Sequence, residues 1–327
     1  MLNAMSDEKR DKAQNIQING TQVASGEYAL VKLNIGRLPT GTLIDIPIHV
    51  FNGKKKGPVV LIQAGLHGDE INGVETLRRM LDENLFQIKR GAVIVVPVLN
   101  IFGFIHFSRD VPDGKDVNRS FPGSKTGSLA SRIAYHYTQE ILPHVDFALD
   151  LHTGGAQRHN YPQARYTLND TESKTLAEAF GAPFCLPSKL INGSFRKATF
   201  KLGVPTVVYE AGESMRFDEM AITLAVKGIL NVLRSQKMLI GQKKIKKGAS
   251  VNLSSSRWIR ASRAGMFIPL IRNGQYVNKG EELGYVSDAY AKRTKFVRAP
   301  FEGHVFCINH QAVVNQGDAL FHLGKEG

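Results

Sequence analysis

The chain has 327 residues, of which 43% are hydrophobic, 22% charged and 8% aromatic. These ordinary proportions exclude a disordered or collagen-like chain, and the length favours one large domain with a smaller second one. The net charge of +13 admits nucleic acid, an anionic membrane or a small anion as a partner. The basic residues are spread out, without a zinc-finger spacing, an aromatic RNA-binding motif or an arginine-rich tail. We therefore expect no nucleic-acid partner.

The N-terminal residues predict no targeting signal. Residues 1–17 are polar and charged, without the apolar stretch of a signal peptide, and residues 1–25 are expected to form a flexible arm. No stretch approaches the length of a transmembrane helix, so we expect no membrane partner. Cys185 and Cys307 lie far apart, which indicates no disulfide framework. Together these features predict a cytoplasmic protein.

From residue 28 the chain alternates between two patterns. Residues 28–51 alternate loosely between apolar and turn residues, as in antiparallel strands. Short, nearly continuous apolar runs predict buried strands at 58–65, 92–99, 147–151 and 204–209. Helical spacing of apolar residues predicts helices at 72–86, 128–142, 171–180 and 217–233. Strands that alternate with helices predict an α/β fold with a mostly parallel sheet flanked by helices.

The pattern of apolar residues changes near the basic run at residues 243–247. Short apolar runs and glycines replace the long helices, and VNKGEEL at 277–283 resembles VNQGDAL at 314–320. Two similar units, with APFEG at 299–303 between them, predict a small pseudo-symmetric all-β domain. The predicted division is a catalytic domain of residues 1–246 and a β-domain of residues 247–327.

Four polar clusters follow predicted strands. They are GLHGDE at 65–70, the loop at 109–123, DLH at 150–152 and YEAG at 209–212. Ligand sites in open α/β sheets gather beyond the carboxyl ends of the strands. We therefore expect the four clusters to meet at one edge of the sheet.

Three of these residues predict a metal site. His67 and Glu70 are three residues apart on a tight turn into a helix, which lets both reach one metal ion. Ile71 stands where an inverted zinc-protease motif has its second histidine, so the third ligand must be distant, and His152 is the best candidate. Two histidines and one carboxylate are a common catalytic zinc shell, and we expect one zinc ion per chain. Asp150 is placed to orient the His152 ring.

Other polar residues fit the hydrolysis of an amide. Zinc polarises a carbonyl and acidifies water, but a base must still move the proton. Glu210 is the natural candidate, since no Lys or Arg stands beside it in the sequence. Arg109 is suited to stabilise a developing oxyanion, and Asn118 with Arg119 is suited to grip a carboxylate.

The motifs GLHGDE, DVNRSF at 116–121, DLHT at 150–153 and EAG at 210–212, in this order, resemble the succinylglutamate desuccinylase and aspartoacylase family. That family is a branch of the zinc-carboxypeptidase-like hydrolases, and the resemblance covers roughly residues 55–235. It implies the following roles: zinc on His67, Glu70 and His152, a substrate carboxylate on Asn118 and Arg119, the scissile carbonyl on Arg109, a general base at Glu210 and a further basic contact at Arg196.

The resemblance also implies a C-terminal β-domain like the biotinyl and lipoyl carriers. After the first repeat the chain reads SDAYA at 287–291, without the methionine-flanked lysine of a carrier. A structural, substrate-gating or oligomerising role is therefore expected for this domain.

The sequence thus predicts a zinc-dependent deacylase that acts on an N-acyl amino acid or a related small anionic amide. A metallocarboxypeptidase would use the same residues, but a covering β-domain would exclude long peptides. A metal-binding regulatory protein without turnover would not need Glu210. No motif specifies the acyl group or the amine, and a homo-oligomer stays open.

Overall fold

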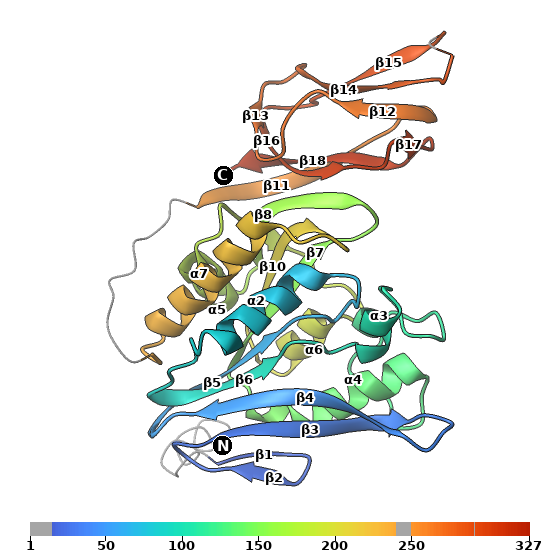
Figure 1. Ribbon diagram of the computed structural model, residues 1–327. Helices are drawn as coiled ribbons and strands as arrows, with labels where there is room; N and C mark the ends of the chain where they lie inside the picture. The colour runs from blue at the N-terminus through green and yellow to red at the C-terminus, as the bar shows by residue number, and fades with distance from the viewer. Residues whose placement is uncertain (1–14, 240–249, 291) are drawn as a thin grey trace.

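One twelve-stranded sheet joins the N-terminal and C-terminal parts of the chain (Figure 1). The computed structural model describes residues 15–239, 250–290 and 292–327. From edge to edge the strands are β13 (Tyr276–Val277), β16 (Gly303–Asn309), β18 (Ala319–Glu326), β11 (Val251–Arg260), β9 (Phe184–Ser188), β8 (Arg158–Thr167), β10 (Thr206–Glu213), β7 (Phe147–Gly154), β5 (Lys55–Gln63), β6 (Arg90–Val96), β4 (Leu43–Asn52) and β3 (Tyr28–Arg37).

The sheet is mixed, with parallel pairs from β10 to β6 and again between β8, β9 and β11. β10, β7, β5 and β6 are parallel to their neighbours in that order. β8 runs antiparallel to β10, and β4 runs antiparallel to both β6 and β3. The mostly parallel sheet predicted for the catalytic domain is therefore confirmed, and so are the antiparallel strands predicted at residues 28–51. The antiparallel pairs have a local reason: β3 and β4 form a hairpin, and β8 follows β7 through a short turn without a helix between them.

Residues 16–23 contain two short strands, which corrects the prediction of a flexible arm for this stretch. β1 (Ile16–Ile18) and β2 (Thr21–Val23) pair antiparallel. The side chains of Ile16, Ile18 and Val23 are buried in the same core as the main sheet. Three apolar residues in a polar stretch are too few to show a strand period. The first 14 residues of the predicted arm lie outside the described residues.

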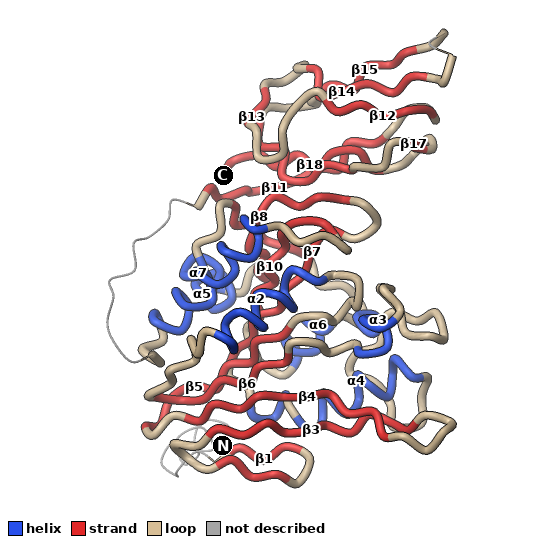
Figure 2. Tube along the Cα trace, viewed as in Figure 1, coloured by secondary structure: helices blue, strands red, loops and turns tan. Residues whose placement is uncertain are grey.

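Helices cover both faces of the sheet (Figures 1 and 2). One face carries α2 (Ile71–Asp82), α5 (Thr171–Phe180) and α7 (Glu219–Ser235). The other carries α4 (Leu129–Glu140), α6 (Phe195–Lys201) and α3 (Ile101–Ile105). The four predicted helices are α2, α4, α5 and α7, whereas α3 and α6 are too short to show a period. No helix in the described ranges is long and apolar enough to cross a membrane.

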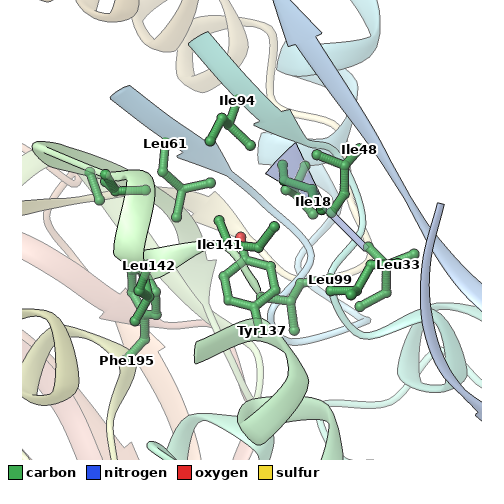
Figure 3. Packing of buried hydrophobic residues seen from close by; sticks show 14 of the residues in the cluster. Ile18, Leu33, Ile48, Leu61, Ile94, Leu99, Tyr137, Ile141, Leu142 and Phe195 are labelled. Atoms are coloured by element: carbon green, nitrogen blue, oxygen red, sulfur yellow. The ribbon is translucent and has the colours of Figure 1, made fainter. Parts of the chain in front are cut away.

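Alternation along β7 separates two cores. Phe147, Leu149 and Leu151 pack with the α2, α5 and α7 side, and Ala148 packs with the α4 side. Figure 3 shows the α4-side core, in which Tyr137 lies among apolar side chains of the sheet and of α6. Asp150 and His152 share the face of Ala148 because side chains alternate along a strand. The polar residues Asp150 and His152 therefore lie at the carboxyl end of β7, at the edge of an apolar core.

Residues 250–327 form an all-β region of strands and loops (Figure 2). Four of its strands extend the main sheet, with β11 parallel to β9 and β16 antiparallel to β8. Four others form a second sheet: β15 (Thr294–Arg298), β14 (Glu282–Ser287), β12 (Gly265–Pro269) and β17 (Val313–Val314). The predicted domain boundary at residues 246 and 247 lies outside the described residues.

The repeated segments of this region form equivalent turns. Gly280 and Gly317 have φ angles of 87° and 92°, which glycine adopts without steric cost. Their N–H groups donate to the carbonyls of Ala299 and Ala261, both at 2.8 Å. The two units are thus pseudo-symmetric in structure as well as in sequence. Their likeness to biotinyl and lipoyl carriers stays a prediction.

Candidate active site

The three predicted metal ligands converge at the carboxyl edge of the sheet. His67 and Glu70 lie in the turn between β5 and α2, and His152 lies near the end of β7. The Nδ1 atoms of His67 and His152 are each 2.8 Å from an oxygen of Glu70. One donor atom from each residue falls within 4.8 Å of the others, and all three side chains are buried. Two imidazoles and one carboxylate are a donor set that fits zinc.

A close backbone approach shapes the turn that carries His67 and Glu70. A Cβ at Gly68 would lie 1.9 Å from the carbonyl carbon of Gly103 in α3. Only glycine lets the turn pass α3 at this distance. The backbone N–H of Thr153 donates to Glu70 Oε2 at 3.0 Å and so ties the turn to β7.

A buried chain of hydrogen bonds orients His152. Asp150 Oδ2 is 2.9 Å from His152 Nε2. Gln63 Nε2 donates to Asp150 Oδ1 at 2.9 Å, and the Tyr137 hydroxyl donates to Gln63 Oε1 at 2.7 Å. An N–H of His152 that donates to Asp150 leaves Nδ1 with its lone pair toward the cluster. Gln63 and Tyr137 belong to no motif, so the sequence does not reveal their part.

The cluster is built to hold positive charge. Burial alone would lower the pKa of both histidines, but the carboxylates outweigh it. Glu70 raises the pKa of His67, and Asp150 with Glu70 raises that of His152 well above its usual value. Burial would raise the pKa of Glu70, but the two imidazoles hold it well below its usual range. A site that attracts protons in this way also attracts a divalent cation that competes with them.

Arg109 reaches the edge of the cluster. Its Nη1 is 3.3 Å from His67 Nδ1 and 3.5 Å from Glu70 Oε1. Its Nη2 and Nε donate to Asp116 Oδ2 at 2.8 and 3.1 Å. The intervening loop folds back on itself through a hydrogen bond from Val111 N–H to Lys115 O at 3.1 Å. Residues 111–115 of this loop therefore leave Arg109 at the site.

Asn118 and Arg119 lie on a short 3-10 turn, η1 (Val117–Arg119), that Asp116 caps. Asn118 Oδ1 accepts from the N–H of Phe195 at 2.9 Å, which leaves the side-chain NH2 as a donor for a ligand. Arg119 Nη1 donates to the carbonyl of Asn118 at 2.7 Å. A Cβ at Gly193 would lie 2.2 Å from the carbonyl oxygen of Arg119, so glycine lets the two segments meet.

Arg196 is a buried guanidinium in the first turn of α6. Its side chain is 8% exposed, and Nη2 donates to Ser188 Oγ at 2.9 Å and to the carbonyl of Lys189 at 2.8 Å. Nη1 has no hydrogen-bond partner among the described residues. Burial, together with the nearby Arg165, lowers the pKa of Arg196 to about 10. In the part of the chain that the structure describes, no carboxylate forms an ion pair with Arg196, which suits the binding of an anionic ligand.

Glu210 stands beside His152, because the two residues are register partners in the parallel pair of β10 and β7. Its Oε2 accepts from Asn160 Nδ2 at 2.7 Å, and its Oε1 is 3.2 Å from Arg165 Nη1. Glu210 has no basic neighbour in the sequence, but in the structure β8 supplies one. The absence of a basic residue beside Glu210 in the sequence therefore does not leave its carboxylate unpaired in the structure.

A cavity of about 300 Å³ joins these groups. Every predicted site residue lines it: His67, Glu70, Arg109, Asn118, Arg119, His152, Arg196 and Glu210. The lining also contains residues that the sequence does not single out, among them Arg158, Asn160, Arg165, Ser188, Ser194 and Trp258. Three of these lie in β8, whose mixed composition hides its strand period. His159, the other histidine near the site in sequence, instead bonds Asp218 and Asn273.

Known proteins share this fold. A crystal structure of a succinylglutamate desuccinylase/aspartoacylase from Rhodobacter sphaeroides has a TM-score of 0.81 and 26% identity, covering 92% of this chain and 96% of its own. The product-bound ectoine utilization protein EutE (DoeB) from Ruegeria pomeroyi has a TM-score of 0.82 and 25% identity, covering 95% and 98%.

Sequence comparison agrees. N-alpha-acetyl-L-2,4-diaminobutyric acid deacetylase from Halomonas elongata is 28% identical over 288 residues, which are 84% of each chain. The model of the succinylglutamate desuccinylase/aspartoacylase catalytic domain matches residues 56–236. This match spans more than half of the chain and includes the His67–Glu70–His152 cluster and Glu210. The chain therefore belongs to the succinylglutamate desuccinylase/aspartoacylase family of enzymes.

Proposed function

We propose that this chain is a zinc-dependent deacylase that hydrolyses the amide of a small, anionic N-acyl amino acid. The observation that carries the proposal is the convergence of two imidazoles and a carboxylate beside Glu210, in a cavity lined by arginines. A zinc-carboxypeptidase-like arrangement and a cytoplasmic location are part of the proposal. One zinc ion per chain is expected, and a homo-oligomer stays open.

His67, Glu70 and His152 would hold the metal, which supplies polarisation of the amide carbonyl and acidification of water. Glu210 takes the proton of the attacking water and passes it to the departing nitrogen, so that an amine and a carboxylate leave. Asn160 and Arg165 fix the plane of the Glu210 carboxylate by contacting both of its oxygens. The water must then approach Glu210 along a remaining lone pair.

Arg109 lies next to the cluster and is placed to donate to the oxygen of the scissile carbonyl as it gains charge. Asn118 and Arg119 are suited to bind the substrate carboxylate, and the unpaired Nη1 of Arg196 offers a further donor. Bidentate binding by guanidinium would orient the amide relative to Glu210.

The relatives suggest the first substrates to test. The Halomonas relative is named for the deacetylation of N-alpha-acetyl-L-2,4-diaminobutyric acid, and the family is named for succinylglutamate desuccinylase and aspartoacylase. A peptidase acting on long chains is disfavoured because Trp258 of the C-terminal region forms part of the cavity wall. A binding protein without turnover is disfavoured because Glu210 stands beside His152.

The test is amine release from N-acetyl and N-succinyl amino acids and from short peptides, with zinc-loaded and chelated protein side by side. We expect chelator-sensitive release from N-acyl amino acids alone. Glu210→Gln should keep its zinc and lose roughly 10²- to 10⁴-fold in kcat. Asp82→Asn, an exposed carboxylate on α2, is the matched control and should keep full rate. Release from peptides alone, or full rate in Glu210→Gln, contradicts the proposal.

A further inference from the structure

A second cavity lies at the end of α2 that is remote from the His67–Glu70–His152 cluster. It has a volume of about 520 Å³, and its lining comes from the turn into β3, the end of β4 and the segment 81–88, which ends α2 and leads to β6. None of these residues lines the cavity of the candidate active site. The 12 residues of α2 separate the two cavities by roughly 18 Å along the helix axis. A cavity of this size can hold a small organic ligand.

The sheet face beneath the second cavity extends beyond the core. Tyr28 in β3 is the register partner of Phe51 in β4, and such partners share one face of the sheet. Phe51 packs against the core on the α2 side. Tyr28 and Leu30 are 55% and 51% exposed, whereas Val31 on the opposite face of β3 is buried in the α4-side core. The α2-side face is therefore open where β3 forms the edge of the sheet (Figure 1).

Aromatic rings form one wall of the second cavity. The centre of the Phe51 ring lies 4.8 Å from that of Tyr28 and 5.1 Å from that of Phe86. The centre of the His49 ring lies 6.1 Å from that of Tyr28, and His49 Nδ1 is 3.0 Å from the Tyr28 hydroxyl. Burial lowers the pKa of His49, so this ring is neutral near pH 7. The half-exposed Tyr28 ring offers an electron-rich surface, and such a surface attracts a cation within about 6 Å of the ring centre.

Glu27 is the one charged residue among the described residues that line the second cavity. Its Oε2 accepts from the N–H of Ala24 at 2.9 Å, which fixes the carboxylate and leaves Oε1 for a ligand. In the ranges that the structure describes, no lysine or arginine forms an ion pair with Glu27. Leu81, in the last turn of α2, also lines the cavity, so the partial negative charge at this end of the helix lies close by. The lining is therefore negative, although the chain carries a net charge of +13.

Lys54 lies beside the turn that precedes β3. A Cβ at Gly26 would lie 3.1 Å from Lys54 Cγ, so the stem of this side chain runs along Gly26. The N–H of Gly26 donates to the carbonyl of Asn52 at 2.9 Å, which holds the turn against the end of β4. Lys54 does not line the cavity. Its ammonium group therefore opposes a bound cation from a distance without filling the place of one.

We propose that the second cavity binds an organic ammonium cation, held against the Tyr28 ring with its charge beside Glu27. The aromatic wall provides the apolar contact, and the single carboxylate selects for positive charge. The site is independent of the proposed function, because it shares no residue with the cavity in which the amide would be hydrolysed.

Choline and its neutral analogue 3,3-dimethylbutan-1-ol test this inference, because the two molecules have nearly the same shape and differ in charge. Each would be titrated against the zinc-loaded full-length chain, with binding followed by ligand-observed NMR. We expect choline to bind at least about tenfold more tightly than the analogue, as a cation–π contact beside a carboxylate implies. High salt should weaken the binding of choline and leave that of the analogue nearly unchanged.

Four variants locate the binding site. Glu27→Gln keeps an oxygen acceptor for the turn, and it should reduce the affinity for choline to that for the analogue. Tyr28→Leu should weaken choline, whereas Tyr28→Phe, which keeps the ring, should retain most of the affinity. Lys54→Gln should strengthen choline binding by a few-fold, because it removes an opposing charge. Asp82→Asn, which removes an exposed carboxylate outside the lining, is the matched control and should change little.

Three outcomes overturn the inference. They are the absence of saturable choline binding, equal affinity for choline and its analogue, and choline binding that neither Glu27→Gln nor Tyr28→Leu weakens. The last result would place choline elsewhere on the chain. Amide hydrolysis is not a readout of these titrations, so failure of the inference leaves the proposed function intact, and failure of the proposed function leaves the inference intact.

Discussion

His67, Glu70 and His152 lie at the ends of neighbouring parallel strands, whereas Arg158 and Trp258 meet only because residues 250–327 return to the sheet beside β9 and β8. The strand ends and short motifs of the parallel strands assemble the side of the cavity that contains His67, Glu70 and His152. The Arg158 side is assembled by pairing between distant segments. Groups on two sides of one cavity can therefore have different structural origins.

Removal of one proposed metal ligand from the His67–Glu70–His152 cluster has the largest expected effect. Glu70→Gln takes away the charge that joins both histidines, so we expect zinc to be lost on dialysis and amide hydrolysis to fall by on the order of a thousandfold. Metal analysis and amine release check this. Glu75→Gln, in the same helix, where Glu75 pairs with Arg78 and Arg79, should keep both metal and rate. Full activity in zinc-free Glu70→Gln would remove the metal cluster from the reaction.

Arg165→Met tests the link between β8 and Glu210, because Arg165 extends from β8 and contacts the Glu210 carboxylate. Without it the carboxylate keeps only the bond from Asn160, and we expect kcat to fall by about 10- to 100-fold with zinc content unchanged. Arg165→Lys should recover part of the loss. Steady-state kinetics with metal analysis would decide; an unaltered kcat would show that Glu210 needs no such support.

His322→Phe tests the buried ring that stacks on Trp258, with 4.1 Å between the ring centres, through its pH dependence. Burial lowers the pKa of His322 to about 3, below its usual 6.5, so the unfolded chain binds a proton that the folded chain refuses between these values. The folded state therefore loses stability as pH falls through this window, by up to about 1.4 kcal/mol per pH unit. His322→Phe should flatten the slope. Urea unfolding of both proteins from pH 7 to pH 4 measures this, and parallel curves would contradict it.

Gln157→Gly, in the turn between β7 and β8, has the smallest expected effect. Glycine adopts the φ of 59° without strain, so we expect a gain of a few tenths to about 1 kcal/mol in the free energy of unfolding. Urea unfolding at neutral pH, with Gln157→Ala as the control, checks the change. A loss of stability would show that the turn is not strained at this position.

The sequence predicts the parts of the fold that depend on local pattern. The apolar runs at 58–65 and 147–151 become β5 and β7, and the helical spacing at 171–180 matches α5. The polar residues at these strand ends meet because parallel strands share a carboxyl edge. The pairing of Glu210 with Arg165 has no such local signal, because it depends on β8 reversing direction beside β10. Trp258 is likewise far from every motif, and only the pairing of β11 with β9 and β18 brings it to the cavity.

The position of β11 also decides which backbone groups of the sheet are left unpaired. Without β11, β9 would present its N–H and C=O groups as an open edge, with Phe184 and Leu186 stripped of the cover of Leu253 and Phe306. Exposed apolar edges recruit strands from other chains. The C-terminal region therefore covers this edge of the sheet, and we expect a chain cut before residue 250 to aggregate.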